Sequence, residues 1–169
     1  MNVSAWHDAL SYSLADFLLF SPRTYHRLFE LYHREWWPLQ VAALVGGLVL
    51  FAGAHRGGIG GQRIALGVLA LAWGWVAWAF HLDRYATINW AATYFAAGFA
   101  AQALLSLLPP CLPPAPAAPV DAVLARRLGL ALVTAALFAA PWLAALGGRP
   151  WVQAELFGFP PDATVLATL

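Results

Sequence analysis

One short stretch of the chain gathers side chains that could do chemistry. Within nine residues it holds His81, Asp83, Arg84 and Asn89. A histidine here could relay protons, orient a ligand or hold a haem or another pigment. A second interpretation needs no activity, because Asp83 and Arg84 could pair at a water-exposed turn while Asn89 satisfies backbone groups at the start of the next helix. We treat these four residues as a candidate polar site and leave both interpretations open.

Four tryptophans belong to the same question. Trp75 and Trp78 precede His81 at intervals of three residues, so a regular helix would place them along one slowly drifting face. Trp36 and Trp37 stand directly before a proline, where the chain is expected to bend. Because tryptophan is enriched at membrane–water interfaces, we expect all four to be interface anchors rather than stacking platforms.

The composition decides the class of protein in which this site lies. Of 169 residues, 62% are hydrophobic and only 10% are charged, which is too little polar surface for a soluble domain. The net charge of +1 offers no electrostatic footprint for nucleic acid. Cys111 is the single cysteine, so an internal disulfide and a thiolate metal cluster are excluded. The chain is expected to be an integral membrane protein that binds no metal.

Four segments are long and apolar enough to cross a bilayer, whose core needs about 20 helical residues. They are residues 38–54, 64–81, 86–108 and 128–146. Because lipid offers no partners to backbone groups, these spans must be helices. The sequence therefore predicts an all-α fold: a single membrane domain built as a bundle of four spans, with a shortened fifth helix as an alternative at the end.

The connections between the spans differ in character. Only residues 82–85 join the second and third spans, so these two should form a tight antiparallel hairpin with the polar stretch at its tip. Residues 109–127 hold six prolines, which favours an extended spacer, and Asp121 stands where an N-cap would. Residues 57–61 are expected to form a flexible glycine turn. Pro141 should kink the fourth span by removing the hydrogen bond to Leu137.

Residues 22–37 have a basic and aromatic character that suits a lipid headgroup region. We expect an amphipathic helix that lies on the membrane, with Ser21 as its N-cap and Pro22 in its first turn. His26 and His33 lie seven residues apart, too far for one shared metal ion without further ligands.

The residue types found in the spans and in the rest of the chain count against several classes of function. None carries Asp, Glu, Lys or Arg in its middle, which counts against ion-coupled transport by this chain alone. No catalytic triad, carboxylate pair or phosphate loop is present, so we expect no enzyme. Small residues recur at four-residue spacing and favour helix association. These pairs and triplets are Ala42 with Gly46, Ala43 with Gly47, Ala70 with Gly74, Ala97 with Ala101, and Ala131 with Ala135 and Ala139.

Orientation rests on the arginines. Five arginines fall on the side of the N-terminus and the polar stretch, and four fall on the other side. These numbers are too similar to decide the orientation of the chain in the membrane. The acids lie mainly beside the five, whereas residues 55–63 are purely basic. We lean towards an N-terminus and a polar stretch that face outward.

Three segments together resemble a known family. Residues 32–40, 80–92 and 157–169 are similar to an uncharacterised bacterial family of small multi-pass membrane proteins, whose members are often labelled permeases. The resemblance implies a fold and a bacterial inner-membrane location but no activity. In similar proteins the final motif leads into another membrane helix, so the ending at Leu169 is expected to be shortened or partial, with Asp162 as the N-cap of that helix.

Three hypotheses for function follow. The first is a non-catalytic accessory or structural subunit that packs within a larger membrane complex, with the lipid bilayer and other membrane subunits or further copies of itself as partners. The second is a small-solute or proton permease that acts as an oligomer, with the candidate polar site near its entrance. The third is a haem- or pigment-binding protein that uses His81.

Overall fold

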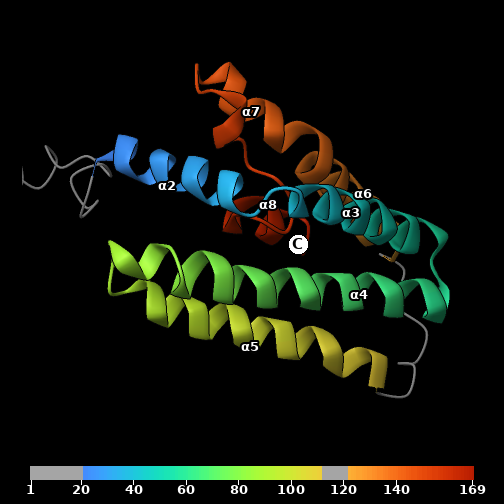
Figure 1. The fold of residues 1–169 in the computed structure, drawn as a ribbon. Helices are drawn as coiled ribbons and strands as arrows, with labels where there is room; N and C mark the ends of the chain where they lie inside the picture. The colour runs from blue at the N-terminus through green and yellow to red at the C-terminus, as the bar shows by residue number, and fades with distance from the viewer. Residues whose placement is uncertain (1–20, 112–121) are drawn as a thin grey trace, which may run out of the picture.

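The computed structural model describes residues 21–111 and 122–169, and this part of the chain is built from helices without any strand (Figure 1). The longer helices are α2 (Pro22–Glu35), α3 (Leu39–Arg56), α4 (Gly58–Trp75), α5 (Ala92–Cys111) and α6 (Ala122–Thr134). The shorter elements are the π-helices η2 (Val76–Leu82) and η4 (Ala135–Ala139), the 3-10 helices η3 (Tyr85–Thr87) and η5 (Trp151–Gln153), and α7 (Ala140–Leu146) and α8 (Pro161–Leu166). The predicted all-α fold is confirmed.

Four helical stretches of the described residues are long and apolar enough to cross a membrane. They are Leu39–Arg56, Gly58–Thr87, Ala92–Pro109 and Val123–Leu146. The second is the central one, because 56% of its apolar window is buried inside the protein, against 17% to 28% for the other three. The predicted set of four spans is thus confirmed, and α4 with its continuation η2 forms the middle of the bundle.

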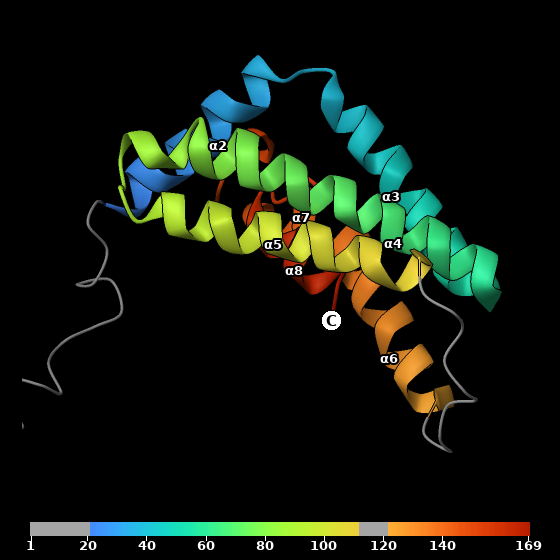
Figure 2. The ribbon, with the colours of Figure 1, turned by 90° about the horizontal axis from the view of Figure 1, so that it is seen from below.

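The second and third spans form the predicted hairpin. Helices α4 and α5 run side by side in opposite directions in both views (Figures 1 and 2). The helix α5 begins at Ala92 rather than at residue 86, because residues 85–91 are occupied by the 3-10 turn η3 and by a capped turn at Asn89. The tip of the hairpin is therefore longer than the sequence predicted.

The connection between α3 and α4 is shorter than predicted. The helix α3 ends at Arg56 and α4 begins at Gly58, so most of the glycine run is helical rather than a flexible turn. Gly57, with a φ of 69°, makes the reversal in a conformation that other residues avoid. A Cβ atom at Gly61 would lie 2.4 Å from the carbonyl oxygen of Gly53. The glycines therefore let the two helix backbones touch.

The fourth span is interrupted where Pro141 was expected to act. Its helix passes from α6 through the π-helix η4 into α7, and Pro141 lies in the first turn of α7. A proline cannot donate to the carbonyl one turn earlier, and the wider π turn accommodates this loss. Of the predicted spacer, residues 109–111 belong to α5 and residues 122–127 to α6, because both helices run past the predicted ends. The rest of the spacer and Asp121 lie outside the described residues.

The buried side chains form two clusters along the bundle. The first lies between α3, α4, η4 and the C-terminal segment, and includes Leu50, Leu69, Trp73, Leu137 and Phe157. The second lies where α2 meets η2, and includes Leu28, Phe29, Tyr32, Val76, Phe80 and Phe159.

Residues 154–160, which we call the return segment, connect these clusters. Phe157 packs into the first cluster and Phe159 into the second, with Gly158 at a φ of 75° between them. The hydroxyl of Thr164 accepts a hydrogen bond from the Gly158 amide (3.0 Å), which fixes this conformation. The helix α8 that follows has Pro160 as its N-cap residue, so Asp162 lies in its first turn and not at the predicted cap.

Candidate functional site at the hinge end

Helix α2 covers the tip of the hairpin, and we call this part of the molecule the hinge end. The helix starts as predicted, with the Ser21 hydroxyl accepting the Thr24 amide and proline in the first turn. Its apolar side, however, packs on protein: Phe29 and Tyr32 are buried against Phe80. The sequence assigned these side chains to the membrane surface, since periodicity cannot tell a lipid surface from a protein surface.

Arg84 joins the tip of the hairpin to α2. Its guanidinium forms an ion pair with Glu35 at the end of α2. Its Nε atom also lies 3.2 Å from the Asp83 carboxylate, although without the geometry of a hydrogen bond. The predicted pairing of Asp83 with Arg84 is therefore present, and Glu35 is a further partner that the sequence did not indicate.

Asn89 caps the start of the third span. Its side-chain oxygen accepts a hydrogen bond from the Ala91 amide (3.0 Å), and its side-chain amide donates to the Tyr85 hydroxyl (3.0 Å). The side chain is buried, so both of its polar groups are used locally. The structural interpretation of Asn89 is confirmed by these bonds.

His81 differs from the other three residues of the candidate site because its side chain is buried among aromatic rings. Its side chain is only 4% exposed, and its ring lies 4.6 Å from that of Phe99 and 5.9 Å from that of Phe95, both on α5. Neither ring nitrogen has a hydrogen-bond partner among the described residues. A buried polar group without a partner is costly, so such a group calls for an explanation.

The direction of His81 differs from the predicted one. Trp75 and Trp78 contact Trp36 on the side of α2, with ring centroids 4.8 and 5.7 Å away. His81 instead faces α5, because η2 has the i to i+5 pattern of a π-helix, which shifts the later side chains around the axis. The three residues therefore do not share one face.

The four predicted anchor tryptophans divide into two groups. Trp36, Trp75 and Trp78 form one cluster, and the indole of Trp75 donates a hydrogen bond to the Tyr32 hydroxyl (2.7 Å). Trp37, by contrast, is 67% exposed. At least one anchor candidate, Trp75, thus has a structural contact inside the protein.

Polar contacts of α2 with the chain around η5 were not predicted. The Nδ1 atom of His33 donates to the carbonyl of Val152 (2.7 Å), and the Gln40 amide donates to the carbonyl of His33 (2.7 Å). Burial lowers the pKa of His33, although the bond to the Val152 carbonyl acts in the opposite direction. The bond between His33 and Val152 joins residues 119 positions apart, so no local sequence pattern could have indicated it, whereas Gln40 lies only seven residues from His33.

Three further arginines at this end, Arg27, Arg34 and Arg149, are also paired, whereas Arg23 forms no ion pair with a described acid. Glu30 lies 2.6 Å from Arg27 and 2.7 Å from Arg34, and the hydrogen bond from Arg27 is the main reason that the pKa of Glu30 lies below its ordinary value. Arg149 bonds to Glu155 at 3.1 Å. The pairing neutralises most of the formal charge of the hinge end.

The chemistry open to this site is limited by its geometry. Asp83, Arg84 and Asn89 are engaged in local pairs and caps, which leaves His81 as the one predicted site residue whose side chain has neither an ion pair nor a hydrogen bond among the described residues. Among the described residues, no group of three or more His, Cys, Asp or Glu side chains could hold a metal ion.

The family model of DUF6064, described as a family of unknown function, matches residues 23–169. This match confirms the predicted resemblance to an uncharacterised family. Among curated proteins and among solved structures, none matches the chain.

Proposed function

The chain belongs to this family of unknown function, and we propose that it is a non-catalytic, multi-pass protein of the bacterial inner membrane that packs as an accessory subunit in a larger complex. The proposal is supported by the way the four spans share their surfaces. Only one side of α5 contacts α4, and most of its remaining surface is exposed. A helix in this position is available to a neighbour.

One observation carries the proposal. Thr93, Ala97 and Ala101 are exposed at four-residue spacing along α5. A Cβ atom added at Gly98 beside them would meet nothing within 4 Å. Lipid tails are as apolar as leucine, so association in a membrane depends on small residues that let helix backbones approach. This surface, which we call the small-residue face of α5, fits a second transmembrane helix better than it fits lipid alone.

By contrast, two glycines of the other small-residue pairs are used within the chain. Gly47 is buried against Leu137 and Phe157, and Gly74 faces Ala103 of α5. The small-residue face of α5 is therefore a surplus that the internal packing does not require.

The test is the size of the particle that contains the chain after mild detergent extraction from the membranes of its own host. We expect a stoichiometric complex larger than one chain. Replacement of Ala97 and Ala101 by leucine should shift most of the chain to the size of a monomer. Gly60→Leu is the control, since it enlarges an exposed small residue of α4 that has open space beside it and belongs to none of the small-residue pairs.

Two outcomes would contradict this role. One is a wild-type chain that runs alone and monodisperse. The other is an equal loss of assembly in the Gly60→Leu control, because the effect would then not belong to the small-residue face of α5.

A second candidate function is a small-solute or proton permease that acts as an oligomer. The observation in its favour is His81, which has unpartnered ring nitrogens inside the π-helix η2. Single π turns inside α-helices occur frequently at functional sites. Purified protein in sealed vesicles should then give a proton or solute flux that His81→Ala abolishes and Trp90→Ala leaves unchanged. Vesicles without flux, or a flux that His81→Ala does not change, would rule this candidate out.

A further inference from the structure

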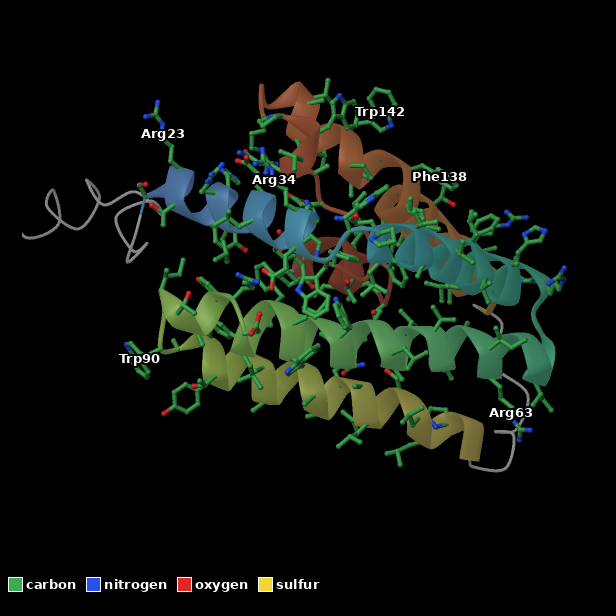
Figure 3. All side chains as sticks on the ribbon, viewed as in Figure 1. Arg23, Arg34, Arg63, Trp90, Phe138 and Trp142 are labelled. Atoms are coloured by element: carbon green, nitrogen blue, oxygen red, sulfur yellow. The ribbon has the colours of Figure 1, made fainter. Side chains whose placement is uncertain are left out.

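The end of the bundle opposite the hinge carries basic side chains only, as far as the structure describes it. We call it the basic end, and it comprises His55, Arg56, Arg63, Arg126 and Arg127. All five are exposed, and none of the four arginines forms an ion pair with a described acid. Figure 3 shows Arg63 at one end of the molecule and Arg23 and Trp90 at the other. Asp121, the nearest acid in sequence, lies outside the described residues.

Arg126 lies at the centre of this end. Its guanidinium donates a hydrogen bond to the carbonyl of His55 at the end of α3 and lies beside Gly57. This contact connects α6 to the α3–α4 turn. Because a guanidinium carries five N–H donors, most of its donors remain for a second partner.

A groove of about 640 Å³ opens beside Arg126. It has polar groups at Gln62, Arg126 and Thr168, and its other walls are apolar side chains and glycines of α3, α4, α6 and the turn between α3 and α4, together with Ala167 and Leu169 after α8. On α4 its lining extends from residue 58 to residue 69, which is about 16 Å of helix. The volume falls within the range of about 300–1,000 Å³ that is usual for sites of small molecules.

We propose that this groove binds one anionic phospholipid. Arg126 holds the phosphate with two of its free N–H groups, and the neighbouring arginines contribute their positive charge. An acyl chain lies between α4 and α6 along the apolar walls near Leu66, Gly129 and Val133. The site therefore combines a charged mouth at the membrane boundary with an apolar channel at membrane depth.

Charge complementarity selects this occupant. A soluble phosphate compound would leave the apolar walls uncovered, and an uncharged lipid would leave four arginines without counter-charges. At the hinge end, Glu30, Glu35 and Glu155 already pair with four arginines, so that only Arg23 lacks an ion pair with a described acid.

Native mass spectrometry of the full chain in detergent tests the proposal, with phosphatidylglycerol and phosphatidylcholine added at equal concentration. We expect one retained phosphatidylglycerol per chain, preferred over phosphatidylcholine by about fivefold or more, as one arginine near an anionic surface provides. Arg126→Gln should lower this preference about fivefold. Arg23→Gln is the matched control, because it removes an exposed arginine at the hinge end, and it should change nothing.

A second variant keeps the test decisive if Arg126→Gln alters the fold through its bond to His55. A Cβ atom at Gly129 would meet nothing within 4 Å, so Gly129→Leu should fold and fill the groove. It should reduce retention of both lipids about tenfold or more. Glycerol 3-phosphate, the headgroup without acyl chains, should not compete.

Four results would overturn the proposal. They are equal retention of the two lipids by the wild-type protein, unchanged binding in Gly129→Leu, an equal loss in Arg23→Gln, or full competition by glycerol 3-phosphate. The last result would identify a soluble phosphate compound as the occupant.

Discussion

The two ends of the bundle are held together in different ways. At the hinge end, aromatic rings from α2, η2 and the return segment fill a closed cluster, and four of the five described arginines, all except Arg23, are paired with acids. At the basic end, α3 and α4 touch through glycines, and the arginines have no acidic partner among the described residues. The difference indicates that the polar groups of the hinge end mainly stabilise the fold, whereas the charges of the basic end are available to a ligand.

Phe80→Ala should have the largest effect, because Phe80 is fully buried in the second cluster and contacts Phe29 and Tyr32. We expect the free energy of unfolding in detergent to fall by about 3 kcal/mol or more, as for other buried aromatic residues truncated to alanine. Trp90→Ala, at a position 71% exposed, is the control and should stay within about 0.5 kcal/mol. Equal losses of stability in Phe80→Ala and Trp90→Ala would show that Phe80 is not part of a tightly packed cluster.

Gly61→Ala tests the packing of the basic end. The new Cβ atom would lie 2.4 Å from the backbone oxygen of Gly53, so α3 and α4 must move apart. We expect a loss of about 1–3 kcal/mol in the free energy of unfolding, the usual cost of overpacking. Gly60→Ala is a close control, since its Cβ atom would meet nothing within 4 Å and alanine favours the helix. A neutral Gly61→Ala would contradict the backbone contact.

Arg84→Gln should have a smaller effect than either packing change. Its side chain is 23% exposed and that of its partner Glu35 is 50% exposed, so solvent screens the pair. We expect a loss of at most about 1 kcal/mol in the free energy of unfolding. When Glu35→Gln is combined with Arg84→Gln, the second change should lower the free energy of unfolding little further, because the ion pair is already broken. Arg63→Gln, at the basic end, should leave stability unchanged; a loss as large as that of Arg84→Gln would remove the contrast between the ends.

The smallest effect should be the response to mild acid. Burial keeps the pKa of His33 below its ordinary value in the folded chain. The unfolded chain therefore binds a proton first, and stability should fall as the pH drops below about 6.5, down to the folded pKa. Thermal unfolding in detergent at several pH values should show this decline. In His33→Gln the decline should be weaker, and an unchanged decline would assign it to another group.

The sequence predicted what depends on local pattern. Hydropathy located four spans, the short connection predicted the hairpin of α4 and α5, and Ser21 and Asn89 cap helices as their residue types suggested. Each of these features needs information from only a few neighbouring residues.

What could not be predicted depends on contacts between distant segments. His81 faces Phe99 because η2 is a π-helix, and the hydrophobic pattern of the sequence does not distinguish a π-helix from a regular α-helix. The glycine run became helical because Gly53 and Gly61 meet across two helices. The apolar side of α2 packs on Phe159, a residue more than a hundred positions later. Only the three-dimensional structure reveals these contacts.

The return segment also has a consequence for the order in which the chain matures during synthesis. The second cluster requires Phe29 of α2, made early, and Phe159, made after all four spans. All four apolar helices are thus made before the partner that completes the packing of α2 exists. Until residue 159 emerges, α2 must remain incompletely packed, and this interval is when a chaperone or a neighbouring subunit has the best access to its aromatic side.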